Sequence, residues 1–468
     1  MHRAIHPASV TPLSLGSTHP VRPFFIPRNA RELAFVVLCS GGEDTEFAAQ
    51  RLEQAAADQV VSPSDRRLAT ELIYGIIRRA ATLDTILKSF VRRGQQQVEP
   101  ELWMILRLGA YQLVMLDGIP PHAAVHETVE LSRRVGRGGW PGFVNGTLRA
   151  ISQIVSPDRT SEPAADAVPL ANGQFGKLSK ALFPDPQTQA ADYFAAAYSF
   201  PDWLAKRWAK IFPAEELFRL GTWFNLPAHL SLRINRLRTT RDEYLGLLAE
   251  RGVAARPGTV SESIQLDGSV RVDDLPHFAE GWVTIQDESS MSAALLMNPQ
   301  PHEKLLDLCA APGGKTTHLA ELQGDQGQIV AVDVQEERLA VVTANAARLQ
   351  LKSIRTHLMS KESLDAPTGP FDGVLVDVPC SNTGVLGKRP EARWRITPYD
   401  MSELPRLQRK LLNLALDCVR PGGRVVYSTC SIEPVENQQL IEQIVRNRPN
   451  VKLIEQRLHL PGQPADGG

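Results

Sequence analysis

The chain has 468 residues and a formal net charge of −1, with 51 Lys and Arg residues against 52 Asp and Glu residues. A chain of this length exceeds one hydrophobic core, so we expect about two or three domains. The balanced charge excludes a globally basic nucleic-acid-binding protein, and any RNA surface must be a local patch. The sequence shows neither an apolar run long enough to cross a bilayer nor a signal-peptide pattern, so we expect no membrane contact.

The chain contains five cysteines, an odd number with no Cys-x-x-Cys pair. This usage argues against a zinc site and against a disulfide framework, and it favours a reducing compartment. The sequence therefore predicts a cytoplasmic protein that binds no metal.

The first half of the chain is predicted to be mainly helical. Residues 1–29 are expected to form a disordered tail. Residues 30–155 are typical of an all-α domain, because apolar residues such as Leu102, Leu106 and Leu113 recur at helical spacing. Paired arginines in this domain are usually solvated, but together they could bind RNA phosphates. Residues 156–195 are rich in Ser, Pro, Asp, Ala and Gln, which predicts a linker or a poorly ordered insertion.

Two further domains are expected after the linker. Residues 196–300 combine helical segments with short alternating strands, as at 230–236, and predict a small α+β module. From residue 301 to 468, strand and helix patterns alternate, with strand centres near 306, 330, 374–378 and 424–428. Such alternation predicts an α/β domain of the Rossmann-like type, with a mostly parallel sheet.

A glycine turn follows the first of these strands. The apolar run that ends at Asp307 precedes Pro312-Gly313-Gly314-Lys315, and helical character follows. A P-loop would need glycine where Cys309 stands, and the dinucleotide G-x-G-x-x-G pattern is missing. Two interpretations of the turn remain. It is either a site for an adenosine-bearing ligand that has no pyrophosphate, or a turn that only connects the strand to the helix.

A second acid favours the ligand site. Asp333 ends the next buried strand, at the spacing of roughly twenty residues where a carboxylate binds ribose hydroxyls in nucleotide-binding folds. Ligands of open α/β sheets bind at the carboxyl ends of the strands. The position of Asp333 therefore weakens the interpretation of a plain turn.

Two cysteines follow the ends of two later strands. Cys380 comes shortly after Asp377, and Cys430 follows Ser428 and Thr429. If the strands are parallel neighbours, both thiols open onto one crevice. A paired thiol suits methyl transfer to carbon 5 of a pyrimidine, because a thiolate that adds to carbon 6 makes carbon 5 nucleophilic.

Three segments resemble the RNA cytosine-5 methyltransferases of the NOL1/NOP2/Sun family. They are residues 307–316 (Asp-Leu-Cys-Ala-Ala-Pro-Gly-Gly-Lys-Thr), 377–384 (Asp-Val-Pro-Cys-Ser-Asn-Thr-Gly) and 428–437 (Ser-Thr-Cys-Ser-Ile-Glu-Pro-Val-Glu-Asn). Residues 121–129 and 143–149 are similar to segments of the NusB-like helical domain of the bacterial group that acts on small-subunit ribosomal RNA. The resemblance implies an N-terminal NusB-like RNA-binding domain over 30–155 and an RNA-binding role for the α+β module over 196–300. It also implies an S-adenosylmethionine-dependent methyltransferase domain over 301–468.

The resemblance also implies roles for individual residues. Cys430 would be the nucleophile, Cys380 would assist product release, and Asp377 would contact the cofactor or the target base. Asp333 would bind the ribose of S-adenosylmethionine. The remaining cofactor-binding residues would be Cys309, Ala310, Ala311, Pro312, Gly313, Gly314 and Lys315. The basic residues after Cys380, which we expect to contact RNA phosphates or bases, are Lys388, Arg389, Arg393 and Arg395.

The sequence departs from this family in two places. The family has a third cofactor-binding acid after the third strand, whereas here Glu362 is the nearest acid and Asp365 lies late. The chain stops at Gly468, so the methyltransferase domain is expected to lack its last strand, which would leave a sheet edge unpaired.

The main prediction is methylation of carbon 5 of a cytosine in 16S ribosomal RNA through a covalent cysteine adduct. A transfer RNA substrate is the alternative within the same chemistry. A catalytically weak RNA-binding assembly factor is the alternative from another class, motivated by the two departures. The expected partner is ribosomal RNA, and the expected oligomeric state is a monomer.

Overall fold

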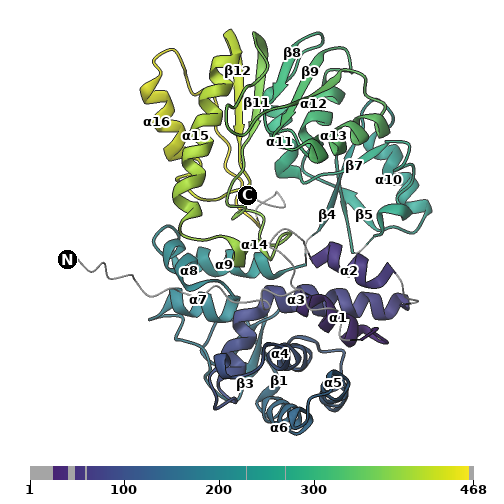
Figure 1. Cartoon of the computed structure of the whole chain (residues 1–468), viewed down its shortest axis with the longest axis vertical. Coiled ribbons are helices and arrows are strands. Elements are labelled where there is room, and N and C mark those ends of the chain that lie inside the picture. Colours follow the sequence, from purple (N-terminus) through teal and green to yellow (C-terminus); the bar gives the residue numbers. More distant parts are fainter. Residues whose placement is uncertain (1–24, 41–47, 58–60, 228, 269, 463–468) are drawn as a thin grey trace, which may run out of the picture. The chain divides into compact units, whose positions relative to one another are not determined.

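The computed structural model describes residues 25–40, 48–57, 61–227, 229–268 and 270–462. The chain divides into two compact units, whose elements are labelled in Figure 1. Unit 1 comprises the residues up to Leu226 together with Arg389–Arg395, and unit 2 comprises Pro227–Lys388 and the residues from Ile396 onward. The predicted disordered tail falls mostly on residues 1–24, which lie outside the described residues.

Unit 1 begins with helices, as the apolar periodicity predicts. In the described part of the chain they are α1 (Ala30–Cys39), α2 (Ala48–Ala57), α3 (Pro63–Lys88), α4 (Pro100–Met115), α5 (Pro121–Val135) and α6 (Trp140–Ser152), with a 3-10 turn at Gln95–Gln97. Local signals set several of their ends. The Asn29 side chain accepts hydrogen bonds from backbone N–H groups that open α1, and a proline occupies the first turn of α3, α4 and α5.

The segment 156–195 is folded, so the prediction of a linker or poorly ordered insertion is wrong. β1 (Val155–Thr160), β2 (Ala167–Pro169) and β3 (Phe175–Leu178) form an antiparallel sheet in the order β1-β3-β2. The side chains of Val168, Phe175 and Leu178 are buried. A few apolar residues and the backbone pairing of three short strands are enough to order a segment whose composition is typical of a loop.

Four further helices belong to unit 1. They are α7 (Ala190–Tyr198), α8 (Asp202–Trp208), α9 (Ala214–Asn225) and the short α14 (Ala392–Arg395). Trp208 lies within 6.1 Å, between ring centroids, of Phe194, Phe200 and Phe224. The middle module was predicted to begin at residue 196, but these helices share an aromatic core within unit 1, and the structural division follows Leu226.

Unit 2 opens with a small α+β module. β4 (Leu230–Ile234), β5 (Ala255–Pro257), β6 (Ser263–Leu266) and β7 (Val283–Ile285) form an antiparallel sheet in the order β5-β6-β4-β7. A 3-10 turn occupies Val272–Asp274. α10 (Arg241–Glu250) begins at a capping box, in which Thr240 and Glu243 exchange hydrogen bonds between side chain and backbone. The predicted strands and helix of this module lie where the sequence pattern puts them, with β5 as an addition.

The second sheet of unit 2 is parallel, which confirms the predicted fold class. Its described strands are β8 (Lys304–Asp307), β9 (Gln328–Asp333), β10 (Ile354–Leu358), β11 (Phe371–Asp377) and β12 (Val419–Ser428), in the order β10-β9-β8-β11-β12. The strand order reverses beside β8, because β9 lies on one side of it and β11 on the other. Ligands of such sheets bind at the carboxyl ends of the strands at this switch point.

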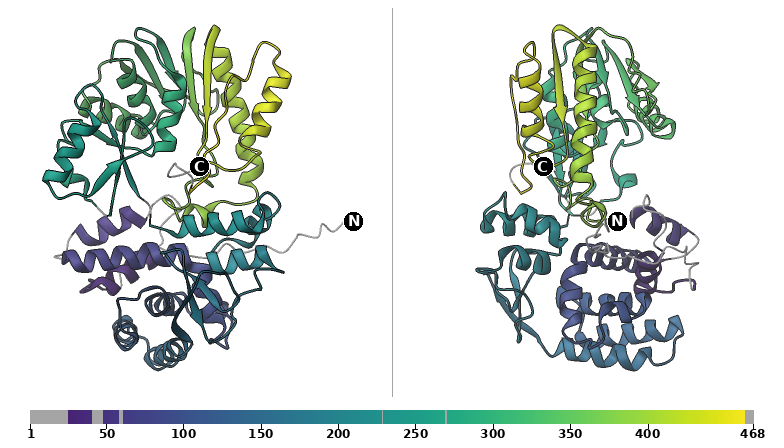
Figure 2. Two further views of the ribbon diagram at one scale, coloured as in Figure 1. Left: turned by 180° about the vertical axis from the view of Figure 1, so that it is seen from behind. Right: turned by 60° about the vertical axis from the view of Figure 1, so that its left-hand side comes forward.

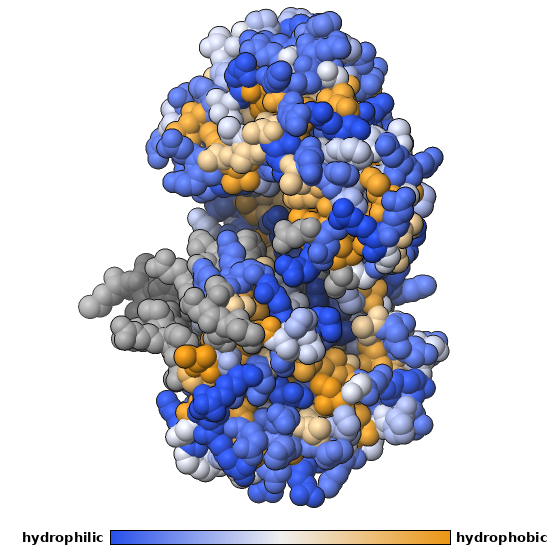
Figure 3. Space-filling view, turned by 90° about the vertical axis from the view of Figure 1, so that its right-hand side faces the viewer, coloured by the Kyte–Doolittle hydropathy of each residue, from blue (hydrophilic) through white to orange (hydrophobic). Residues whose placement is uncertain are grey.

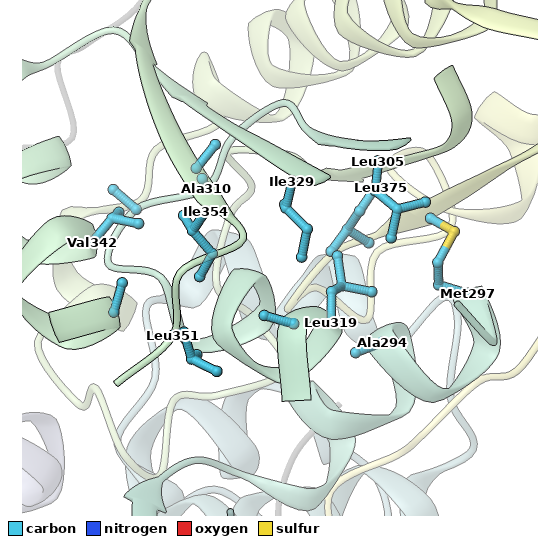
Figure 4. Packing of buried hydrophobic residues seen from close by; sticks show 14 of the residues in the cluster. Ala294, Met297, Leu305, Ala310, Leu319, Ile329, Val342, Leu351, Ile354 and Leu375 are labelled. Carbon is cyan, nitrogen blue, oxygen red and sulfur yellow. The ribbon is translucent and has the colours of Figure 1, made fainter. Parts of the chain in front are cut away.

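Helices cover both faces of the parallel sheet (Figure 2). α11 (Glu288–Met297), α12 (Gly314–Leu322) and α13 (Glu336–Arg348) pack on one face, and α15 (Asp400–Cys418) and α16 (Gln438–Asn447) pack on the other. Successive strand residues alternate between the faces. Leu305 packs with Ala294 and Leu319 in the first layer, which Figure 4 shows, whereas its neighbour Leu306 joins the second. Burial on both faces explains the near-continuous apolar runs of these strands.

Figure 3 shows one face of the molecule coloured by hydropathy. On the face drawn in Figure 3, hydrophilic residues cover most of the area, and apolar residues form separate patches. Within the described residues, no helix has the length and apolar character needed to cross a membrane.

Candidate active site

The carboxyl ends of four parallel strands bring polar side chains to one edge of the sheet in unit 2. Asp307 ends β8, Asp333 ends β9, Asp377 ends β11 and Ser428 ends β12. Asp377 and Ser428 are partners in the strand register, and Asp307 is the partner of Leu375. The sheet therefore places the predicted cofactor residues and both cysteine loops at the same edge.

The turn between β8 and α12 is tied to the end of β9. The backbone N–H of Ala310 donates to the Val332 carbonyl at 2.8 Å, and the N–H of Ala311 donates to Asp333 Oδ2 at 3.3 Å. Gly313 has a φ of 100°, and a Cβ there would lie 3.2 Å from Cα of Val342. A residue without a side chain is therefore required where the turn passes α13.

Asp333 is buried but keeps hydrogen-bonding capacity. Its Oδ1 accepts from the Gln335 N–H at 3.2 Å, its Oδ2 lies 3.5 Å from Nη1 of Arg338, and the residue is 5% exposed. A carboxylate oxygen can accept two hydrogen bonds, so this group can still accept from the hydroxyls of a ligand. The chemistry of Asp333 fits a ribose-bearing cofactor.

Asp307 is a site residue that sequence reasoning did not assign. Thr316 Oγ1 donates to its Oδ2 at 2.6 Å, while Oδ1 has no hydrogen-bond partner within the described residues. Burial raises the pKa of Asp307 to about 7, and the nearby Asp377 carboxylate adds to the rise. The signal in the sequence is an acid that ends an apolar run before a glycine turn.

Lys315, in the first turn of α12, contacts the end of β11. Its Nζ donates to Asp377 Oδ2 at 2.7 Å, and Ser428 Oγ donates to Asp377 Oδ1 at 2.6 Å. Burial alone would lower the pKa of Lys315, but the Asp377 carboxylate offsets it and the pKa is raised. Lys315 therefore stays charged at neutral pH and orients the Asp377 carboxyl group.

The two predicted thiols are adjacent. Sγ of Cys380 lies 2.9 Å from Sγ of Cys430, and the structure has no disulfide between them. Cys430 Sγ also donates to Asn382 Oδ1 at 3.1 Å. The contact with Cys430 and then burial raise the pKa of Cys380 well above its ordinary value. Burial likewise raises the pKa of Cys309, which leaves that thiol protonated and unsuited to attack a substrate.

A buried carboxylate is hydrogen-bonded to both segments that carry the cysteines. Glu436 is fully buried, and its oxygens accept from the backbone N–H of Ser381 at 3.0 Å and from Ser431 Oγ at 2.9 Å. Each of these serines directly follows one of the two cysteines. Sequence reasoning did not select Glu436, although it lies within the segment 428–437 that carries the resemblance.

The basic residues after Cys380 do not act as one group. Arg393 is fully buried in unit 1, where its guanidinium donates to the Ser199 and Phe224 carbonyls at 3.1 and 3.0 Å, so the prediction that it contacts RNA is wrong. The cost of burying the charge is offset by these carbonyls. Lys388, in unit 2, forms an ion pair with Asp287. Arg389 is exposed and Arg395 half-buried, and RNA contact by them stays a prediction.

The acids after β10 are engaged in their own loop. Asp365 Oδ1 accepts from the Ser360 N–H at 2.8 Å, and Glu362 Oε2 accepts from Ser360 Oγ at 2.9 Å. Both acids are exposed and hydrogen-bonded to Ser360.

Comparison with protein families matches three parts of the chain. Residues 28–153 match the NusB family, residues 200–273 match the ferredoxin-like domain of RsmF/B-like methyltransferases, and residues 294–466 match the 16S rRNA methyltransferase RsmB/F family. The ferredoxin-like match begins in the helices that the structure groups with unit 1. Fold and site together define a Rossmann-like RNA methyltransferase with a NusB domain at its N-terminal end.

Similar proteins extend over nearly the whole chain. The probable ribosomal RNA small subunit methyltransferase B of Synechocystis is 36% identical over 423 residues, which cover 90% of this chain and 89% of that protein. The Bacillus subtilis protein of the same name is 31% identical over 424 residues, with the same coverage. The solved structure of PH0851 is 26% identical, with a TM-score of 0.68 over 92% of this chain and 91% of that one. The chain belongs to the RsmB/F family of 16S rRNA methyltransferases.

Proposed function

We propose that the protein methylates carbon 5 of a cytosine in small-subunit ribosomal RNA, with Cys430 as the covalent nucleophile. The observation that carries the proposal is the pair of thiols 2.9 Å apart at the ends of neighbouring strands, beside the edge that holds Asp333. Carbon 5 of cytosine is a poor nucleophile until a group adds to carbon 6. An oxygen or nitrogen methyltransferase would need no such thiol pair.

Cys430 is the better nucleophile of the two. The raised pKa keeps Cys380 protonated, so its thiol can donate toward the neighbouring sulfur. Cys430 first releases its thiol proton to solvent. The thiolate then forms a bond to carbon 6, and the electrons of the double bond between carbons 5 and 6 move to carbon 5. After methylation the proton on carbon 5 leaves to a base, the bond between sulfur and carbon 6 breaks, and its electrons return to Cys430. Cys380 assists the release of the methylated RNA.

The residues around the glycine turn fit S-adenosylmethionine, which when bound supplies the electrophilic methyl group. Asp333 would accept from the ribose hydroxyls, and the turn from Cys309 to Lys315 would line the cofactor. Asp377, oriented by Lys315 and Ser428, would contact the cofactor or the target base. A target base inside a duplex would have to be flipped out to reach the thiols.

The ribosomal substrate rests on the relatives, which are named as small-subunit ribosomal RNA methyltransferases. Such RNA is found in the cytoplasm, where we also place this protein, and we take a monomer as its state. A transfer RNA substrate would use the same thiol chemistry. The engaged acids Glu362 and Asp365 favour a second candidate, an RNA-binding assembly factor with weak activity.

A groove in unit 1 supports RNA binding by the helical domain. α5 and α6 enclose a hollow of about 650 Å³, lined by residues that include His122, His126, Arg133, Asn145 and Arg149. The lining residues found in the described part of the chain include no carboxylate, although Glu130 pairs with Arg133 at the rim. Cationic and amide side chains of this kind bind RNA phosphates. Most of the lining residues belong to the two segments that resemble NusB-like domains, residues 121–129 and 143–149.

Bisulfite sequencing of ribosomal and transfer RNA, from cells with and without the gene, tests the proposal. Loss of one protected cytosine in small-subunit RNA is the expected result. Loss of a protected cytosine in a transfer RNA would keep the chemistry and overturn the substrate. Unchanged RNA in both classes would overturn the enzyme and favour the assembly factor.

A further inference from the structure

We infer that Glu436 is a positioning residue that sets the separation of the two reacting thiols. The inference rests on the proposed function, because it concerns the same thiol pair. Glu436 acts through the residue that follows each cysteine, because it accepts hydrogen bonds from Ser381 and Ser431. No role in the reaction follows from its place in the sequence alone.

The hydrogen bonds of Glu436 link the two loops. Oε2 accepts from the Ser381 N–H at 3.0 Å and from Gln408 Nε2 at 2.8 Å, and Oε1 accepts from Ser431 Oγ at 2.9 Å. Gln408 also donates to the Pro379 carbonyl at 3.0 Å, directly before Cys380. One carboxylate thus fixes the backbone that flanks Cys380 and the side chain beside Cys430.

Three hydroxyl groups complete the link. Oγ of Ser381 lies 3.1 Å from Oγ1 of Thr383 and 3.0 Å from Oγ of Ser431, and Thr383 Oγ1 lies 3.1 Å from Ser431 Oγ. The backbone N–H of Ile432 donates to Thr383 Oγ1 at 3.2 Å. All three hydroxyl-bearing residues are buried, so water does not compete readily for these bonds.

Burying a carboxylate costs more free energy than filling the same space with an apolar side chain. Burying a charge costs free energy unless it is well hydrogen-bonded. The donors to Glu436 from Ser381, Gln408 and Ser431 are neutral. An apolar side chain would fill the volume but leave the Ser381 N–H and the Gln408 amide without this acceptor. The arrangement is therefore suited to fixing loop geometry, and displacements of about 1 Å at a reacting group can cost roughly a hundredfold in rate.

The test compares Glu436→Leu with Glu436→Gln in the full-length protein. The Gln variant keeps an acceptor for Ser381 and Gln408, and the Ser431 hydroxyl can rotate to accept from its amide. We expect the Leu variant to lose about a hundredfold in kcat on RNA with an unchanged Kd for S-adenosylmethionine. The Gln variant should stay within about tenfold of the wild type. Glu442→Leu, at an exposed acid on α16, is the matched control.

A second readout needs no RNA and so separates this inference from the proposed function. Diamide, an azo oxidant, takes two electrons and two protons from Cys380 and Cys430 and leaves one disulfide, which mass spectrometry of the intact protein measures. The Leu variant should form this disulfide at least about tenfold more slowly, since the thiols no longer meet as often, whereas the Gln and Glu442→Leu variants should match the wild type.

The outcomes separate cleanly. A Leu variant that forms the disulfide at the wild-type rate overturns the positioning role, whatever its methylation rate. Slower disulfide formation together with a wild-type protein that methylates no RNA keeps the positioning role and overturns the proposed function. If the Leu variant does not fold, Ser431→Ala removes one link only, and an unchanged disulfide rate in that variant likewise overturns the inference.

Discussion

The Lys315 ammonium group, from the glycine turn, lies 2.7 Å from Oδ2 of Asp377 at the end of β11. Lys315 belongs to the predicted cofactor-binding turn, residues 309–315, and Asp377 lies shortly before Cys380. This ion pair therefore connects the cofactor-binding turn to the segment that carries the first of the two cysteines. Both side chains are largely withdrawn from solvent, with 17% of Lys315 and 31% of Asp377 exposed. The ion pair is therefore a direct contact between the cofactor-binding turn and the end of β11.

Lys315→Met should slow methylation by about ten- to a hundredfold, because a hydrogen bond to a charged group contributes about 1.5–3 kcal/mol. Single-turnover methylation of RNA at saturating cofactor measures the effect. Lys352→Met, on an exposed lysine, is the control and should retain the wild-type rate. An unchanged rate in Lys315→Met would show that Asp377 needs no cation to orient it.

The two cysteines should fail in different ways. Cys430→Ala should reduce methylation to the background without enzyme and form no covalent RNA complex, because the thiolate that activates carbon 5 is gone. Cys380→Ala should still attack the base but release it slowly, so a covalent complex should accumulate on a denaturing gel. The reverse pattern would make Cys380 the nucleophile.

Asp333→Asn should weaken S-adenosylmethionine binding by about tenfold or more, since it removes the charge that accepts from the ribose. Isothermal calorimetry on the purified protein measures this. Asp365→Asn is the matched comparison and should bind the cofactor normally, because that carboxylate is exposed and accepts hydrogen bonds within its own loop. Equal weakening in both variants would identify Asp365 as the third cofactor-binding acid.

Asp307 should make the protein less stable as the pH rises from about 4 to 7. Burial raises its pKa to about 7, so in this range the folded state binds a proton that the unfolded state has lost. The free energy of unfolding should fall by at most about 4 kcal/mol across the range, at roughly 1.4 kcal/mol per pH unit. Asp307→Asn should remove this slope, as urea unfolding at pH 5 and pH 8 would reveal. Parallel pH profiles for the two proteins would contradict a raised pKa.

Arg149→Glu, in the α5–α6 groove, should weaken RNA binding and reduce the salt dependence of the binding constant by about one phosphate contact. Fluorescence anisotropy with a labelled RNA at several salt concentrations measures both quantities. Arg446→Glu, an exposed arginine on α16, serves as the charge-matched control. If both variants lose the same affinity, only net charge matters and the groove has no special role.

Local patterns were sufficient for most of the fold. Apolar periodicity predicts the helices of α1–α6, and short apolar runs that end in acids predict β8, β9 and β11. These signals work because they depend on residues close together in the chain. The prediction of a linker at 156–195 was wrong for the same reason. The three short strands there gain stability by pairing with one another, which local composition does not reveal.

The sequence alone determined the family, the parallel sheet, and the residues at the strand ends, because motif chemistry and alternation of strands and helices are local properties. Only the tertiary structure decided that Arg393 is buried within unit 1 and that Cys380 and Cys430 are in contact. The same holds for Glu436, which is hydrogen-bonded to both segments that carry the cysteines. Burial and pairing between distant segments depend on how the strands are ordered in the sheet, and a residue's neighbours along the chain do not specify that order.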